Sequence, residues 1–210
     1  MNMLSRLLFL ALALMTGFSA HAQRPYKGDL STHPTTETSW ADHVFLTMDL
    51  DRQIGQLIML RAHSDLGPDH IAHVKAEIKK YHVGGLCFFQ GSPEKQLQLT
   101  NEYQRLSDLP MMVSMDAEWG LGMRLPKQTI SFPKQLALGA IRNNQLIYDM
   151  GVEIAREMHH LGVNVSFSPV LDVNNNPDNP VINTRSFGQD RHNVTIQGYQ
   201  DIPLTLYTPA

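Results

Sequence analysis

The sequence contains a single cysteine in 210 residues and no excess of basic residues. One cysteine cannot form an internal disulfide, so a small disulfide-stapled fold is excluded. Lys and Arg number 17 against 20 Asp and Glu, which argues against nucleic acid as the main partner because no basic stripe can neutralise phosphates. Cys87 lies in the apolar run Leu86–Phe89, where we interpret it as a small buried hydrophobe rather than a nucleophile.

Apolar runs long enough to cross a bilayer are also missing. The apolar run Leu7–Met15 follows a basic N-terminal segment and precedes the small residues Ala20–Ala22, which is the pattern of a secretory signal peptide. We therefore expect residues 1–22 to be a signal peptide cleaved near Ala22, with no stable membrane anchor. An exported chain without disulfides fits a bacterial periplasm, so the protein is expected to be periplasmic or secreted. Residues 23–39 are polar and predict an N-terminal arm.

Several catalytic and nucleotide-binding signatures do not occur. There is no G-x-S-x-G elbow, Walker loop or dinucleotide fingerprint. The pair His159–His160 has no partner ligand at helical spacing, so it indicates a solvated helix end rather than a metal site. The loop Leu171–Pro180 resembles a calcium loop around Asp178 only loosely, because the Gly and the final Glu of that pattern are missing. We expect its Asx residues to form turns.

Strand and helix patterns alternate between residues 54 and 170. Strands are predicted at 54–60, 83–89, 111–115 and 163–170, and helices at 68–82, 92–107 and 143–161. The start of the first strand is also compatible with a preceding helix capped by Asp49. The last helix shows an apolar face at helical spacing, formed by Leu146, Ile147, Met150, Ile154 and Met158. This order predicts an α/β protein with a parallel sheet, either doubly wound or a TIM barrel.

The strongest chemical signal is the segment MDAEWGLGMRL, residues 115–125. Asp116 ends a predicted strand, and parallel α/β proteins bind ligands at that end of their strands. Its carboxylate could accept hydrogen bonds from vicinal sugar hydroxyls, or it could cap the loop. Asp116 and Glu118 together would also suit the acid/base pair of a glycosidase. Arg124 could bind a ligand oxygen or pair with Glu118.

Two more residues are candidates on the same side of the predicted sheet. Asp172 follows the fourth predicted strand, at the end where a site is expected. Arg185 lies downstream, in the segment Asn183–Gly188. Taken alone, Arg185 indicates only a surface arginine.

Four segments of the sequence resemble glycoside hydrolase family 3. MDAEWGLGMRL is similar to the Asp-x-Glu-Gly-Gly-x-x-x-Arg segment of that family, and three more family segments follow in order at Ser131–Pro133, Phe167–Val173 and Arg185–Asp190. The resemblance covers residues 40–198 and looks closest to the bacterial β-N-acetylglucosaminidase branch. It implies the N-terminal part of a TIM (β/α)8-type barrel. It also implies removal of terminal β-linked N-acetylglucosamine from oligosaccharides or peptidoglycan fragments, with retention and without a metal ion or cofactor.

The resemblance also implies roles for individual residues. Asp116, Arg124 and Arg185 fall on family positions that bind the non-reducing sugar, Asp116 through hydroxyls far from the cleaved bond and the arginines by orienting the ring. Glu118 is left unassigned. Trp119 stands where the family usually has Gly, and it either stacks on the sugar or lines the loop. The alternatives are β-glucosidase specificity and a non-catalytic sugar-binding half-barrel.

One departure from the family concerns the chemical step. The family's N-acetylglucosaminidases carry a later Lys-His-Phe-Pro-Gly-His-Gly segment with the His acid/base, and a still later Asp nucleophile; neither occurs in this sequence. A retaining displacement needs both groups, so we expect the chain as given to be inactive. We expect an atypical tail at 199–210, arising from a frameshift or truncation.

Overall fold

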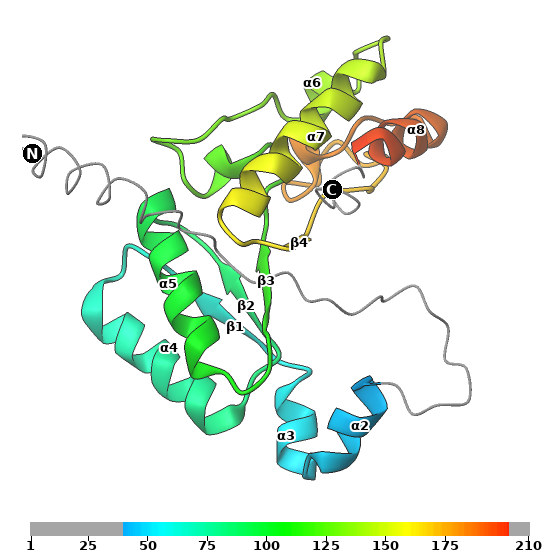
Figure 1. Cartoon of the computed structure of the whole chain (residues 1–210). Coiled ribbons are helices and arrows are strands. Elements are labelled where there is room, and N and C mark those ends of the chain that lie inside the picture. Colours follow the sequence, from blue (N-terminus) through cyan, green and yellow to red (C-terminus); the bar gives the residue numbers. More distant parts are fainter. Residues whose placement is uncertain (1–39, 202–210) are drawn as a thin grey trace, which may run out of the picture.

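The computed structural model describes residues 40–201, which form one parallel sheet joined by helical crossovers (Figure 1). The strands are β1 (Met59–Ala62), β2 (Gly85–Phe88), β3 (Met112–Met115) and β4 (Val165–Ser166). They lie side by side in chain order, and every pairing is parallel. The predicted α/β class is therefore confirmed. The predicted signal peptide, the N-terminal arm and the predicted tail after Asp201 lie outside the described residues.

Helices precede, connect and follow these strands. The α-helices are α2 (Trp40–Thr47), α3 (Leu50–Gly55), α4 (Gly67–Tyr81), α5 (Pro93–Leu106), α6 (Gln135–Leu138), α7 (Gln145–His160) and α8 (Arg191–Asp201), and the 3-10 helices are η1 (Leu121–Met123) and η2 (Asn183–Arg185). The hydroxyl of Ser92 accepts a hydrogen bond from the Lys95 backbone N–H at 3.3 Å. Together with Pro93 in the first turn, this cap starts α5 where the sequence predicts it.

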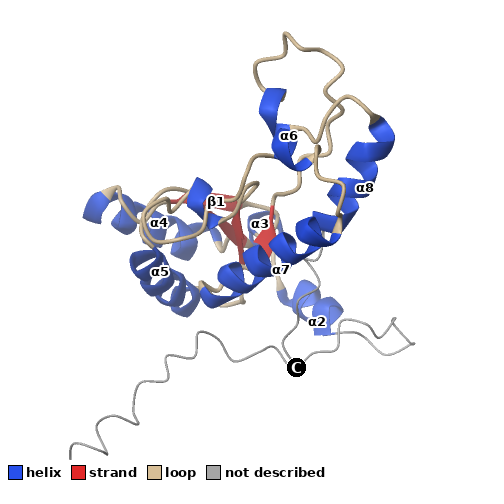
Figure 2. Ribbon diagram, turned by 90° about the horizontal axis from the view of Figure 1, so that it is seen from above, coloured by secondary structure: helices blue, strands red, loops and turns tan. Residues whose placement is uncertain are grey.

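One face of the sheet is covered and the other is open. Leu86, Phe88, Val113 and Met115 are fully buried in the core, which also contains residues of α4, α5 and α7. On the opposite face Met112 is 57% exposed. Seen from above, the helices lie around the strands (Figure 2). Since parallel sheets are normally covered on both faces, this arrangement corresponds to part of a barrel wall whose open face is the barrel interior.

The first predicted strand, 54–60, divides between a helix and a strand. The Asp49 side chain accepts a hydrogen bond from the Arg52 backbone N–H at 2.9 Å and caps α3, which continues to Gly55. The strand begins only at Met59. The alternative of a helix capped by Asp49 is thus confirmed, and the strand prediction is wrong for the first residues of that range.

The fourth predicted strand, 163–170, is much shorter than expected and covers only β4. The side-chain oxygen of Asn164 accepts the hydrogen bond of the Val113 N–H at 2.9 Å, in place of a backbone carbonyl. Pro169 has no N–H to continue the ladder. The helix before this strand, α7, buries Ile147, Met150, Ile154 and Met158 as predicted, whereas Leu146 is exposed.

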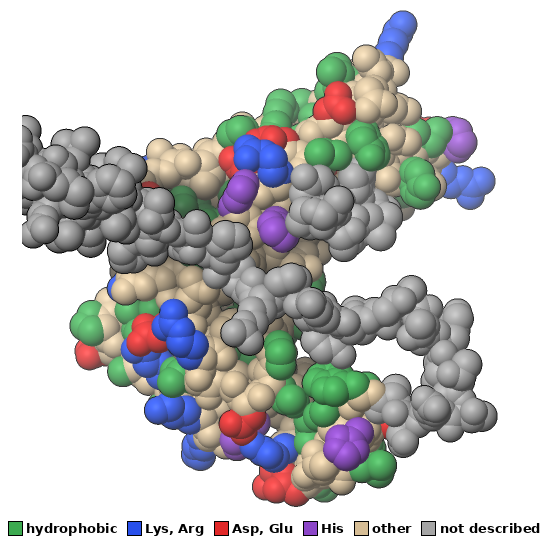
Figure 3. Space-filling view, in the orientation of Figure 1, with side chains coloured by type: hydrophobic (Ala, Val, Ile, Leu, Met, Phe, Trp, Pro, Cys, Tyr) green, Lys and Arg blue, Asp and Glu red, His purple; other side chains and the backbone are tan. Residues whose placement is uncertain are grey.

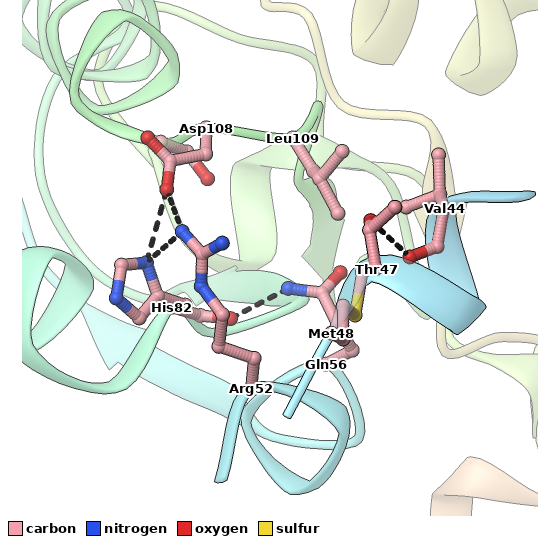
Figure 4. A pocket seen from close by; sticks show the side chains of 9 residues that line it. Val44, Thr47, Met48, Arg52, Gln56, His82, Asp108 and Leu109 are labelled. Carbon is pink, nitrogen blue, oxygen red and sulfur yellow. Dashed lines mark hydrogen bonds and ion pairs between the residues drawn. The ribbon is translucent and has the colours of Figure 1, made fainter. Parts of the chain in front are cut away.

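The amino-terminal ends of the strands carry an apolar groove and a charged cluster. The groove, about 770 Å³ in volume, is lined by α2, α3, Met59 and Met112, and hydrophobic side chains gather over this part of the surface (Figure 3). In the charged cluster, Arg52 donates a hydrogen bond to Asp108, and His82 Nδ1 lies 3.3 Å from an Asp108 oxygen (Figure 4). Within residues 40–201 no helix is both long and apolar enough to cross a membrane.

Candidate sugar-binding site

Asp116 and Arg124 form an ion pair at the carboxyl end of β3. Asp116 directly follows the strand, and Arg124 directly follows η1. Arg124 Nη2 donates a hydrogen bond to Asp116 Oδ2 at 2.5 Å. The Asp116 side chain remains 30% exposed, while that of Arg124 is largely buried. The arginine therefore pairs with Asp116, and the alternative of an Arg124–Glu118 pair is wrong.

Two glycines allow the loop between these residues to fold back tightly. Gly120 has a φ of +89°, a conformation that L side chains rarely adopt. A Cβ at Gly122 would lie 2.8 Å from the Ile130 carbonyl oxygen. That approach lets the Gly122 N–H donate to Ile130 O at 2.9 Å, and the Phe132 N–H donates to Trp119 O at 2.9 Å. The loop is thereby pinned to residues 130–132, which fixes where Arg124 leaves it.

Glu118 and Arg185 form a second ion pair, in which the carboxylate is the more deeply buried partner. Arg185 Nε lies 2.9 Å from Glu118 Oε2, and Arg185 Nη2 lies 2.6 Å from Oε1, so the contact is bidentate. The Glu118 side chain is only 4% exposed, and that of Arg185 is 35% exposed. Hydrogen bonding to Glu118 raises the pKa of Arg185. The pair anchors η2 to the loop after β3 across 67 positions of sequence.

The buried pair decides how the two carboxylates can act. Both oxygens of Glu118 accept hydrogen bonds from Arg185, and the Glu118 carbonyl accepts one from Gln135. A carboxylate whose two oxygens both accept hydrogen bonds from one guanidinium is occupied by that partner rather than by a ligand. Glu118 is therefore a positioning residue for Arg185, and the geometry does not support an Asp116–Glu118 acid/base pair. Asp116 is the carboxylate that remains open to a ligand.

The first two strand ends contribute residues that the sequence interpretation missed. Phe89 directly follows β2, and the Arg124 guanidinium carbon lies 4.5 Å from its ring centroid. His63 directly follows β1 and stacks on Phe89, with ring centroids 5.4 Å apart. Their positions in the sequence could have indicated them, because each directly follows a strand, as Asp116 does. Applying the strand-end rule to every predicted strand would have found Phe89.

Asp172, the Asx residues of the following loop and Trp119 make contacts with other parts of the protein. The Asp172 carbonyl accepts a hydrogen bond from Ser186 Oγ at 2.5 Å, and the Asp172 charge contributes to the raised pKa of Arg185. Asn176 Oδ1 accepts a hydrogen bond from the Asp178 N–H at 3.1 Å, which confirms the prediction of Asx turns. The Lys134 ammonium lies 5.0 Å from the Trp119 ring centroid.

The predicted roles of the histidine pair and the cysteine can also be compared with the structure. His159 and His160 are exposed at the end of α7, as predicted. Burial raises the pKa of the Cys87 thiol, and this half-buried residue suits packing better than nucleophilic attack. Within residues 40–201 no group of three His, Cys, Asp or Glu side chains could hold a metal ion.

A parallel sheet with two arginine–carboxylate pairs beyond the carboxyl end of β3 is typical of α/β proteins that bind a polar ligand at their strand ends. Residues 49–202 match the glycosyl hydrolase family 3 N terminal domain. The chain belongs to this family, which confirms the resemblance seen in the sequence. The predicted fold, the N-terminal part of a TIM (β/α)8-type barrel, is confirmed as well.

Known relatives are considerably longer than this chain. "Beta-hexosaminidase A" of Pseudoalteromonas piscicida is 36% identical over 137 residues, covering 60% of this chain and 23% of the relative. "Beta-N-acetylglucosaminidase/beta-glucosidase" of Cellulomonas fimi is 26% identical over 160 residues, covering 76% and 28%. A solved family 3 β-N-acetylglucosaminidase from Paenibacillus sp. str. FPU-7 is 31% identical with a TM-score of 0.68, covering 76% and 31%. The chain spans less than a third of each relative.

Proposed function

We propose that this chain holds the sugar-binding residues of a retaining glycosidase that removes terminal β-linked N-acetylglucosamine. The observation that carries the proposal is the Asp116 carboxylate at the end of β3, held by Arg124 and still open to solvent. The named activities of the relatives support it, since one is called a β-hexosaminidase and another a β-N-acetylglucosaminidase. Oligosaccharides and peptidoglycan fragments are the proposed substrates.

Asp116 would contribute the strongest hydrogen bonds to the sugar. Arg124 occupies Oδ2, which leaves Oδ1 and the remaining lone pair of Oδ2 for sugar hydroxyls. Hydrogen bonds to an ionised carboxylate are about twice as strong as neutral ones. Because Arg124 is largely buried and lies over Phe89, the carboxylate is held in one orientation before the sugar arrives. Such preorganisation reduces the entropic cost of positioning the ring.

Arg185 would orient the sugar from the opposite side of the loop. Its Nε and Nη2 are committed to Glu118, and Nη1 donates to the Val181 carbonyl at 3.2 Å. The exposed edge of the guanidinium is therefore fixed in direction. A neutral side chain at Glu118 would leave that edge free to turn. Glu118 thus supports binding without touching the sugar.

Sugar binding by the full chain tests the proposal. We expect saturable binding of N,N′-diacetylchitobiose in calorimetry, and a loss of affinity of about tenfold or more in Asp116→Ala, since a hydrogen bond to a charged group is removed. Asp51→Ala is the matched control, because Asp51 is exposed at the other end of the sheet. Equal affinities for wild type and Asp116→Ala would overturn the proposed role of Asp116.

β-Glucosidase specificity is the second candidate, supported by the double name of the Cellulomonas fimi relative. In the proposed binding mode Asp116, Arg124 and Arg185 would contact hydroxyl groups, which glucose and N-acetylglucosamine share. A parallel titration with cellobiose separates the two candidates. We expect diacetylchitobiose to bind more tightly, and stronger binding of cellobiose would favour a glucosidase.

We also propose that the protein is exported to the bacterial periplasm. The support is the signal-peptide pattern of residues 1–22. Fractionation of cells that express the full chain tests this proposal. A processed product in the periplasmic fraction is expected, and an unprocessed cytoplasmic product would contradict it.

A further inference from the structure

The Phe89 ring contacts two guanidinium groups, that of Arg124 and that of Arg61. The guanidinium carbon of Arg61 lies 5.1 Å from the Phe89 ring centroid, and that of Arg124 lies 4.5 Å from it. Arg124 is paired with Asp116. In contrast, no carboxylate of residues 40–201 lies within 4.0 Å of a side-chain nitrogen of Arg61. Arg61 therefore brings an unneutralised positive charge to the wall of the site.

A buried histidine holds Arg61 in place. Arg61 Nε donates a hydrogen bond to His63 Nε2 at 2.8 Å. A neutral imidazole that accepts on Nε2 carries its hydrogen on Nδ1, and His63 Nδ1 lies 3.4 Å from Asp65 Oδ1. The backbone N–H of His63 donates a hydrogen bond to His70 Nε2 at 3.1 Å. These contacts use only Nε of Arg61, and among the described residues its terminal nitrogens Nη1 and Nη2 make no hydrogen bond.

Arg61 lies on the open face of the sheet, close to the Asp116–Arg124 pair. Met59 and Ser114 share the open face, since Ser114 Oγ lies 3.6 Å from the Met59 sulfur. Side chains two residues apart on a strand point the same way, so Arg61 lies on the same face as Met59. Asp116 directly follows β3, and its partner Arg124 lies over the same Phe89 ring as Arg61. The strand register agrees, because Arg61 pairs with Cys87 and Cys87 pairs with Ser114. Arg61 thus borders the sugar site from β1.

We propose that Arg61 binds an oxyanion carried by the glycoside, a carboxylate or a sulfate, and so selects acidic N-acetylglucosaminides over neutral ones. The inference rests on the proposed function, because it places the anion beside a sugar held by Asp116. A guanidinium is a planar fork whose two terminal nitrogens match two anion oxygens. His63 and Phe89 present that fork in one orientation, which reduces the entropy lost on binding.

Three ligands test this proposal on the full chain by calorimetry. N,N′-Diacetylchitobiose is neutral, N-acetylglucosamine linked to N-acetylmuramic acid carries a carboxylate on the neighbouring sugar, and sulfated N-acetylglucosamine carries its charge on the sugar itself. We expect one of the two acidic ligands to bind about tenfold more tightly than the neutral one, and the preferred ligand shows which source of oxyanion Arg61 serves. The preference is expected to shrink at high salt.

Variants of Arg61 separate this inference from the proposed function. Arg61→Met is expected to bring the acidic and neutral affinities together, Arg61→Lys to keep part of the preference, and the control Arg142→Met, at an exposed arginine, to keep all of it. Neutral binding that depends on Asp116 but shows no acidic preference, or a preference that survives Arg61→Met, overturns the role of Arg61 alone. Absence of all binding overturns both proposals.

Discussion

The two ends of the sheet both carry arginine–carboxylate contacts, but in different surroundings. At the carboxyl end, Glu118 is 4% exposed and meets Arg185 through two short hydrogen bonds. At the amino end, Arg52 is 40% exposed and Asp108 is 62% exposed. Water reaches both partners of the second contact, whereas in the first contact it reaches Arg185 but hardly reaches the Glu118 carboxylate. The same chemistry therefore serves a site at one end and a surface link at the other.

The two contacts differ in how deeply the carboxylate is buried, and therefore in the free energy needed to remove it from water. Burying a carboxylate costs several kcal/mol unless a partner compensates for the lost hydration. Glu118 has such a partner in Arg185, which under the proposed function is held beside the sugar. The Arg52–His82–Asp108 cluster links α3 and the end of α4 to the loop between α5 and β3.

The largest effect is expected for Glu118→Gln. The change leaves Arg185 without its charged partner, and we expect the free energy of unfolding to fall by about 2 to 3 kcal/mol, somewhat below the range for a fully buried pair because Arg185 is partly exposed. Sugar affinity should fall with it, since Arg185 loses its orientation. Urea denaturation measures the first effect and calorimetry the second. A loss below about 0.5 kcal/mol, as for surface pairs, would remove the contrast between the two ends.

A buried carboxylate without an arginine provides the next test. Asp201 is almost fully buried, and among the described residues neither of its oxygens has a hydrogen-bond partner. Burial raises the pKa of Asp201 from 3.8 to about 7. Since the folded state holds the proton more tightly than the unfolded state, the stabilising contribution is complete below pH 3.8 and is lost as the pH rises through 7.

We therefore expect the wild type to lose about 2 kcal/mol of stability between pH 5 and pH 8 through Asp201. Asp201→Asn cannot ionise, so it should remove this loss and be the more stable form at pH 8. Urea denaturation at both pH values provides the measurement. Parallel pH profiles for the two proteins would contradict this account of Asp201.

The smallest effect is expected for Arg52→Met. The lost contact with Asp108 is exposed, so the free energy of unfolding should change by less than about 1 kcal/mol. The difference between variant and wild type should nearly vanish in high salt. Sugar affinity should stay within about twofold, because the cluster lies at the other end of the sheet. A larger loss of affinity would mean that the amino end also shapes the site.

Local signals predicted the fold well where a cap or a strong period marked the element. The Ser92–Pro93 start of α5 and the apolar face of α7 are examples, and both reflect interactions within a few residues. The fourth strand was overestimated because the Asn164 side chain and Pro169 interrupt its ladder, which periodicity does not reveal. Helix α2 buries none of its residues, so it offered little amphipathic signal.

The candidate site was predictable only in part. Asp116 and Arg124 lie eight residues apart on one short loop, and their shared segment pointed to a common site. The Glu118–Arg185 pair joins positions 67 residues apart, and nothing local to either residue indicates the other. The sequence around Arg61 contains no signal that distinguishes it from other strand residues. Its contact with Phe89 arises only from the pairing of β1 with β2. Contacts between strand ends depend on the assembled sheet.

A structure of the full chain with bound N,N′-diacetylchitobiose would test the central claim most directly. We predict that hydroxyl oxygens of the terminal sugar lie within about 3 Å of the Asp116 carboxylate. We also predict that the Glu118–Arg185 pair is retained beside the ring. A sugar bound at the amino end of the sheet, or held without any contact to Asp116, would contradict it.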